Sequence, residues 1–173
     1  MDNLPFPEII DFHRAVTLKS HYQGEISPVF LNRLAESTAE ICEAARADFE
    51  FFTDLQGLET IQGTVSCKVK LTCERCGEPF VYDLQASFLS SWDERKAKSL
   101  KLEDKIDLVE LNGEGQFELL HYLEDCLLLE IPYAPRHLDG DSSCTRLGSS
   151  WTYGKIEEQA HPFGALKALK KQQ

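Results

Sequence analysis

The sequence predicts an α+β fold: an antiparallel sheet built on a long central hairpin, with a few packing helices. Apolar and polar side chains alternate over residues 61–71, as in a strand with one buried face. The same period of two resumes over residues 80–88, so the two runs predict one hairpin spanning about residues 60–90. The clearest helical periodicity lies in residues 116–131, where Phe117, Leu120, Leu123 and Leu127 form one apolar stripe.

The elements before the hairpin are less regular. Residues 1–10 contain two prolines and predict an irregular lead-in, whereas residues 15–26 predict a short strand ended by a turn. Ser27 followed by Pro28 is typical of a helix start, with Ser as the cap and Pro in the first turn. We expect that helix to end near Ser37.

Residues 46–53 are interpreted as a further strand, although the alanines and glutamates of residues 39–47 also favour helix. Together with the hairpin, this strand predicts three adjacent antiparallel strands. Residues 92–105 have the charged composition of a solvated connector, and residues 106–109 predict a short strand.

Length and composition indicate one folded domain. The chain has 173 residues and is 42% hydrophobic, which is enough for a single core. We place the domain at residues 1–154 and a basic amphipathic tail at residues 155–173.

The net charge of −11 argues against DNA binding, because a duplex-binding surface requires clustered Lys and Arg. No apolar run approaches the ~20 residues of a membrane span, and the N-terminus lacks the features of a signal peptide. We therefore expect a cytoplasmic protein that does not bind membranes and whose six cysteines are reduced.

One region is strongly acidic. Residues 106–130 contain seven carboxylates and no Lys or Arg. Such a segment is either an ordinary solvated face or a docking site for a basic partner. Both interpretations stay open from the sequence.

Four residues are candidate metal ligands. Cys73 and Cys76 occupy a C-x-x-C-G turn, a spacing that lets both sulfurs reach one tetrahedral ion. His137 and Cys144 lie in the polar loop after the prolines that end the acidic helix. The four residues predict a structural zinc site, and the alternative is a turn that packs without metal. The other cysteines, Cys42, Cys67 and Cys126, fall in periodic segments and are assigned to burial.

Catalytic chemistry has little support. A dithiol oxidoreductase would need a source of lowered thiol pKa, and the sequence after Gly77 continues as a strand rather than a helix. The five histidines lack metalloprotease spacing, and no nucleophile-elbow or phosphate-loop motif occurs. A ribonuclease built on paired carboxylates remains an alternative, but abundant Asp and Glu do not make a constellation.

Several segments together resemble a known family. They are Tyr22-Gln23-Gly24, residues 71–80 around the two cysteines, Leu128-Leu129-Glu130-Ile131-Pro132, and His161-Pro162-Phe163 with the residues that follow. In this order they resemble the YceD family, the large ribosomal RNA subunit accumulation proteins of bacteria and plastids. The resemblance implies a role in synthesis, processing or stability of the large-subunit ribosomal RNA, with no enzymatic activity assigned to the family. The family often has a second thiol pair after the proline-bounded helix, as in a split zinc ribbon, where this chain offers His137 and Cys144.

The expected function is therefore that of a non-enzymatic ribosome-biogenesis factor that binds a ribosomal protein or a large-subunit ribosomal RNA precursor. The alternative is a metal-dependent RNA-processing enzyme. RNA contact would require small basic areas, such as Lys68, Lys70 and Arg75 on the hairpin or the lysines of the tail from Lys167 to Lys171.

The tail is the second candidate for partner binding. It combines apolar and basic side chains in a segment too short to hold a helix alone. It is interpreted either as a docking peptide or as a segment that folds back on the acidic helix. The residues assigned to partner binding are Phe163, Leu166, Lys167, Leu169 and Lys170.

Overall fold

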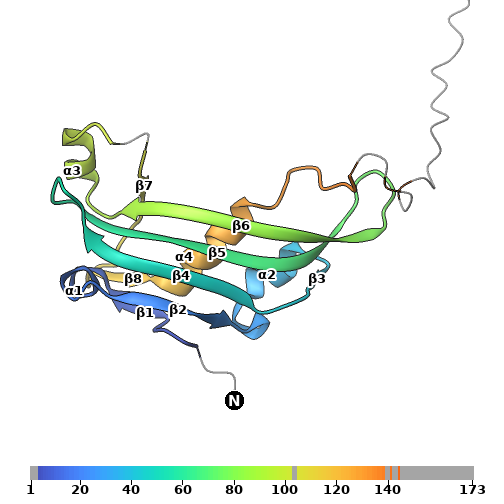
Figure 1. Cartoon of the computed structure of the whole chain (residues 1–173), viewed down its shortest axis with the longest axis horizontal. Coiled ribbons are helices and arrows are strands. Elements are labelled where there is room, and N and C mark those ends of the chain that lie inside the picture. The colour runs from blue at the N-terminus through green and yellow to red at the C-terminus, as the bar shows by residue number, and fades with distance from the viewer. Residues whose placement is uncertain (1–3, 103–104, 139–140, 142–143, 145–173) are drawn as a thin grey trace, which may run out of the picture.

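The computed structural model describes residues 4–102, 105–138, 141 and 144. Its main body is a six-stranded sheet with the strand order β2-β4-β5-β6-β7 and with β3 beside β5 (Figure 1). The strands are β2 (His21–Ile26), β3 (Glu40–Ile41), β4 (Ala45–Thr53), β5 (Glu59–Thr72), β6 (Pro79–Ser91) and β7 (Asp107–Leu108). All pairings are antiparallel except that of β7, which runs parallel to the end of β6.

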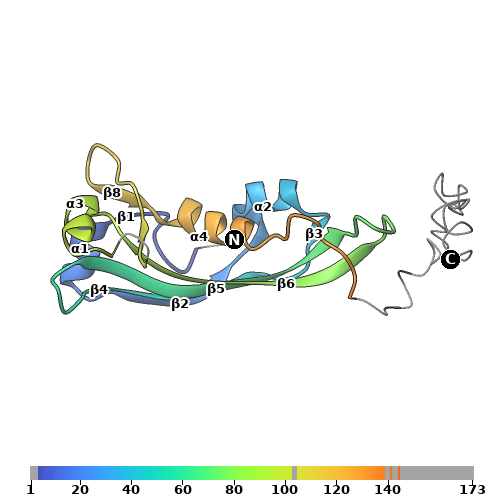
Figure 2. The ribbon, with the colours of Figure 1, turned by 90° about the horizontal axis from the view of Figure 1, so that it is seen from above.

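A second layer covers one face of this sheet. It contains the two-stranded sheet of β1 (Ile9–Asp11) and β8 (Gln116–Glu118), the helices α2 (Asn32–Ser37) and α4 (Leu119–Leu129), and a 3-10 turn, Pro28–Phe30. Two further short helices, α1 (Phe12–Thr17) and α3 (Glu94–Ser99), lie at the end of the sheet remote from the hairpin tip. Figure 2 shows α2 and α4 on the same side of the sheet, whose other side the described elements leave bare.

The core lies between these two layers. The alternation in the hairpin places one stripe of each strand against α4, and α4 contributes Leu119, Leu120, Leu123 and Leu127. Aromatic rings pack beside α1: Phe12 makes edge contacts with Phe51 and Phe117, at centroid distances of 5.2 and 5.5 Å. Each such buried side chain stabilises the fold by about 1.5–3 kcal/mol.

One glycine lets the strands approach closely. Gly63 of β5 is paired with Phe49 of β4, and a Cβ at this position would lie 2.4 Å from the Phe49 Cβ. No side chain fits there without a shift of the strands. This close approach explains a glycine inside a long strand.

The predicted fold class, the central hairpin and the strand at residues 46–53 are confirmed. The hairpin keeps one register throughout, from Thr60 opposite Ser91 to Thr72 opposite Pro79. No described helix is long and apolar enough to cross a bilayer.

The elements before the hairpin differ from the prediction. Residues 9–11 form β1 rather than irregular chain. The strand expected over residues 15–26 is confirmed only as β2, His21–Ile26, because residues 15–17 belong to α1. The Asp11 carboxylate accepts a hydrogen bond from the Arg14 N–H at 2.8 Å and thereby caps α1. The helix expected from Ser27 is broken after a 3-10 turn, and the Ser27 side chain forms no cap. Its end at Ser37 is as predicted.

Two elements after the hairpin also differ. Residues 94–99 of the expected connector form α3, whose cap is Asp93 and whose Ala97 is buried. The acidic helix begins at Leu119, because the residues around Phe117 pair with β1 as strand β8. The short strand near residues 106–109 is confirmed as β7.

Candidate metal centre

The tip of the β5–β6 hairpin positions two thiols. The Cys73 N–H donates to the Glu78 carbonyl at 3.0 Å, and the Gly77 N–H donates to the Cys73 carbonyl at 2.8 Å. These bonds close a tight turn in which Gly77 has φ +76°, a conformation that favours glycine. The turn leaves the sulfurs of Cys73 and Cys76 near one point.

The chain after α4 returns to this tip. Pro132 and Pro135 prevent the helix from continuing, and residues 130–138 run from α4 toward the hairpin tip (Figure 1). There the Glu74 N–H donates to the Pro135 carbonyl at 2.8 Å, and the His137 ring lies 4.9 Å from the Phe80 ring, centroid to centroid. These contacts fix His137 beside the thiols.

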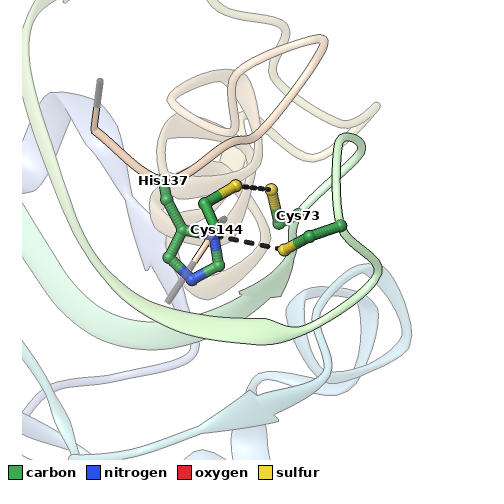
Figure 3. Close-up of side chains that lie close together, drawn as sticks. Cys73, His137 and Cys144 are labelled. Carbon is green, nitrogen blue, oxygen red and sulfur yellow. Dashed lines mark hydrogen bonds between the residues drawn. The ribbon is translucent and has the colours of Figure 1, made fainter. Parts of the chain in front are cut away.

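The four predicted ligands come together. The ligand atoms of Cys73, Cys76, His137 and Cys144 all lie within 4.8 Å of one another, and Figure 3 shows Cys73, His137 and Cys144 grouped around one point. The Cys73 and Cys144 sulfurs are 3.8 Å apart, and the Cys76 sulfur is 3.5 Å from the His137 Nδ1.

These separations match a tetrahedral site. With Zn–S of about 2.3 Å and Zn–N of about 2.05 Å, tetrahedral angles require S···S of about 3.8 Å and S···N of about 3.6 Å. A disulfide is not formed, because it requires sulfurs about 2.05 Å apart. The donor set and these two separations therefore fit one zinc ion.

The surroundings favour thiolates at part of the site. Burial of Cys73 opposes its charged form, but hydrogen bonds from the main chain of His137, Cys76 and Arg75 prevail and lower its pKa to about 5. The Arg75 Nε–H also donates to the Cys144 sulfur at 2.9 Å. The sequence offered no source for a lowered thiol pKa, and that expectation was wrong for Cys73.

Cys76 is different. A main-chain hydrogen bond from Glu78 favours its thiolate, but burial and the nearby thiols of Cys73 and Cys144 prevail and raise its pKa. The repulsion between neighbouring thiolates is what a bound cation relieves. The cluster is thus arranged so that a divalent ion would balance its charge.

The remaining cysteines lie elsewhere. Cys67 is buried as predicted, whereas Cys42 and Cys126 are half-buried. Burial raises the pKa of Cys67 and of Cys126 to about 11, so both remain thiols near neutral pH. The five tail residues assigned to partner binding, from Phe163 to Lys170, lie outside the described residues.

The basic area expected on the hairpin is largely neutralised. Lys68 pairs with Glu43 at 3.0 Å, and Lys70 pairs with Glu40. The third member, Arg75, donates to Cys144 of the candidate metal site, the group of Cys73, Cys76, His137 and Cys144 that we call the metal cluster. One sequence feature indicated that Arg75 would contact the thiols, namely its position between Cys73 and Cys76.

Comparison with known proteins identifies relatives along the whole chain. The family profile described as "Large ribosomal RNA subunit accumulation protein YceD" matches residues 61–170. A curated protein of that name from Haemophilus influenzae is 28% identical over 178 aligned positions, which cover 98% of this chain and 99% of that protein. No solved structure matches. Since the family profile covers more than half of the chain, including the thiol turn and the acidic helix, this protein belongs to the YceD family.

Proposed function

We propose that this protein is a non-enzymatic ribosome-biogenesis factor. It supports synthesis, processing or stability of the large-subunit ribosomal RNA by binding a ribosomal protein or the RNA precursor, and it acts in the cytoplasm. The observation that carries this proposal is the similarity over 98% of the chain to a protein named for large ribosomal RNA subunit accumulation. A likeness of this extent involves the whole fold rather than one motif.

The metal cluster supports a structural rather than a catalytic role. A catalytic zinc keeps one coordination position for water or substrate, whereas a structural zinc has four protein ligands. Here four protein ligands converge, and Cys73, His137 and Cys144 are buried. We therefore assign zinc, if bound, to folding, and the alternative of a metal-dependent RNA-processing enzyme gains nothing from this site.

A bound zinc would join two distant segments. Its ligands Cys76 and His137 are 61 residues apart, so the ion would hold His137 and Cys144 at the hairpin tip. Three thiolates and a neutral imidazole around Zn²⁺ leave one negative charge, which the Arg75 guanidinium beside Cys144 partly offsets.

The tail completes the proposal. Residues 155–173 form a basic amphipathic extension of the domain at residues 1–154, and Phe163, Leu166, Lys167, Leu169 and Lys170 dock on the ribosomal partner. Their apolar and basic composition is unusual in a chain with a net charge of −11 and supports contact with a partner. Truncation after Gln159 distinguishes docking of the tail on a partner from folding of the tail back on the domain.

Depletion of the protein in its host tests the proposal. We expect large-subunit ribosomal RNA to fall relative to small-subunit RNA, and the wild-type chain to restore it. An unchanged ratio would refute the assigned role. A pull-down with nuclease treatment then separates the partner classes: ribosomal proteins that stay bound after RNA digestion support a protein partner, and complete loss supports RNA contact.

A further inference from the structure

The second long strand of the hairpin has an open edge. β6 forms the upper margin of the sheet in Figure 1, and along most of its length it pairs only with β5. β7 covers only its last residues, opposite Ser90 and Ser91. At the hairpin tip, Phe80 contacts His137. Residues 81–87 remain between these two ends.

The hydrogen-bond pattern shows which main-chain groups point outward. Consecutive residues of an antiparallel strand direct their N–H and C=O groups alternately to the two sides. Glu78 bonds inward to Cys73, and Ser91 accepts from Val109 on the outer side. Because the register between them is unbroken, the outward residues are Val81, Asp83, Gln85 and Ser87. No described residue pairs with their outward main-chain groups.

This edge lacks the usual protection. Exposed edges are normally short, or carry Lys, internal Pro or a bulge that prevents pairing with other chains. β6 has 13 residues, a continuous register, a proline only at its first position and a single charged residue, Asp83. An extended segment of about seven residues, or about 24 Å at 3.4 Å per residue, fits along it.

Acidic side chains near the end of β6 indicate which kind of segment would pair with its open edge. A groove of about 470 Å³ lies between residues 108–112 and α4, next to the end of β6, because its lining residue Tyr122 is hydrogen bonded to Ser90 at 2.6 Å. The groove lining includes Glu110, Glu118 and Asp125 and no Lys or Arg. Asp125 is paired with Arg33 at 2.6 Å, and Glu118 lies 3.9 Å from His121, so Glu110 is the carboxylate most available to a basic chain. Glu110 forms no ion pair with another described residue.

We infer that the open edge of β6 takes an extended, Lys- and Arg-rich protein segment as an added strand, with its basic side chains reaching the acidic groove. Main-chain bonds to the outward residues supply affinity, and the carboxylates select a basic chain. A second copy of this chain is disfavoured, because each copy has a net charge of −11. The inference rests on the proposed function and names its partner as a basic ribosomal protein rather than RNA.

Substitutions at Gln85 test the edge directly. Gln85→Pro removes an outward N–H and places a ring in the path of an added strand, whereas Gln85→Ala removes only the side chain. Glu110→Gln tests the charge separately and alters no main-chain bond. Circular dichroism melting must show Gln85→Pro folded; if it is not, Ser87→Pro with Ser87→Ala replaces the pair.

The probe is the set of large-subunit proteins extracted from ribosomes and freed of RNA, with transcribed large-subunit RNA as the second ligand. We expect wild type and Gln85→Ala to bind a basic protein, Gln85→Pro to bind it at least tenfold more weakly, and Glu110→Gln to weaken binding mainly at low salt. A photo-reactive residue at Ser87 should crosslink to a Lys- and Arg-rich stretch of that protein.

Three results would overturn the inference: equal protein binding by folded Gln85→Pro and Gln85→Ala, binding of RNA alone, or a Ser87 crosslink to another copy or to residues 145–173 of the same chain. Complementation distinguishes this failure from failure of the proposed function. If Gln85→Pro restores ribosomal RNA as wild type does, only the edge is refuted; if wild type itself has no effect, the function is refuted.

Discussion

Loss of one buried thiol should remove the zinc and destabilise the whole domain. Cys73 is 1% exposed, and Cys73→Ser leaves its neighbours in place while removing a soft ligand. A bound ion would close a loop of 61 residues between Cys76 and His137, and the chain-entropy relation for a cross-link of that length gives about 4 kcal/mol. For a chain of this size, that corresponds to a fall in melting temperature of about 8–16 °C.

The assay combines metal content with thermal unfolding. Wild-type protein purified without chelator should contain one zinc per chain by elemental analysis, and Cys73→Ser should contain none. Chelator should lower the melting temperature of wild type to that of the variant and leave the variant unchanged. Cys42→Ser is the matched control, because Cys42 is a half-buried thiol outside the cluster.

Two results would refute this reasoning. Zinc far below one per chain in wild type would leave the cluster as a metal-free packing contact. A melting temperature for Cys73→Ser within about 2 °C of wild type, equivalent to less than about 1 kcal/mol, would show that the metal orders only its own loop.

Three further predictions concern other parts of the chain. Glu124→Ala should lower the free energy of unfolding by about 2–4 kcal/mol in urea titration. The reason is that the Glu124 carboxylate is buried and accepts hydrogen bonds from the Arg33 guanidinium and the Leu34 N–H. Asp125, which also pairs with Arg33, is exposed, so Asp125→Ala should lower the free energy of unfolding by less than about 1 kcal/mol. Gly63→Ala should cost about 1–3 kcal/mol in the same titration, because its Cβ would meet the adjacent strand at 2.4 Å, whereas Gly113→Ala, with nothing within 4 Å, should be nearly neutral. Truncation after Gln159 should abolish restoration of large-subunit RNA at unchanged melting temperature if the tail docks on a partner; loss of both would indicate folding back, and loss of neither would rule out docking.

The sequence predicted the hairpin well because its two faces have different surroundings. One stripe of β5 packs beneath α4 and the other faces solvent, so the period of two appears directly in the residue types. The errors occurred where a tertiary contact chose between local alternatives. Phe117 has helical spacing with the leucines that follow, but pairing with Ile10 of β1 makes it strand. At residues 15–17, the Asp11 cap favours helix over the apolar alternation.

The grouping of the four candidate ligands was predictable in part. The spacing of Cys73 and Cys76 alone predicts that their sulfurs can reach one ion. Their approach to His137, by contrast, depends on the Glu74–Pro135 hydrogen bond and on the Phe80 ring. Such contacts join segments about 60 residues apart and leave no periodic signal. The orientation of Arg75 toward Cys144 has the same origin, since either face of the turn was open to a long basic side chain.

The turn that carries Cys73 and Cys76 leads directly into β6, the strand with the open edge. A zinc ion bound at this turn would therefore also limit where a partner can pair with β6. The Phe80 ring contacts His137, and the Glu74 N–H bond to the Pro135 carbonyl holds the chain after α4 at the hairpin tip. β7 covers the other end through the Val109 N–H bond to Ser91. An incoming strand is therefore restricted to residues 81–87, and the register of pairing is limited at both ends. Release of the tip would lengthen the exposed edge, so loss of zinc should loosen the register in which a partner strand pairs with β6 as well as lower stability.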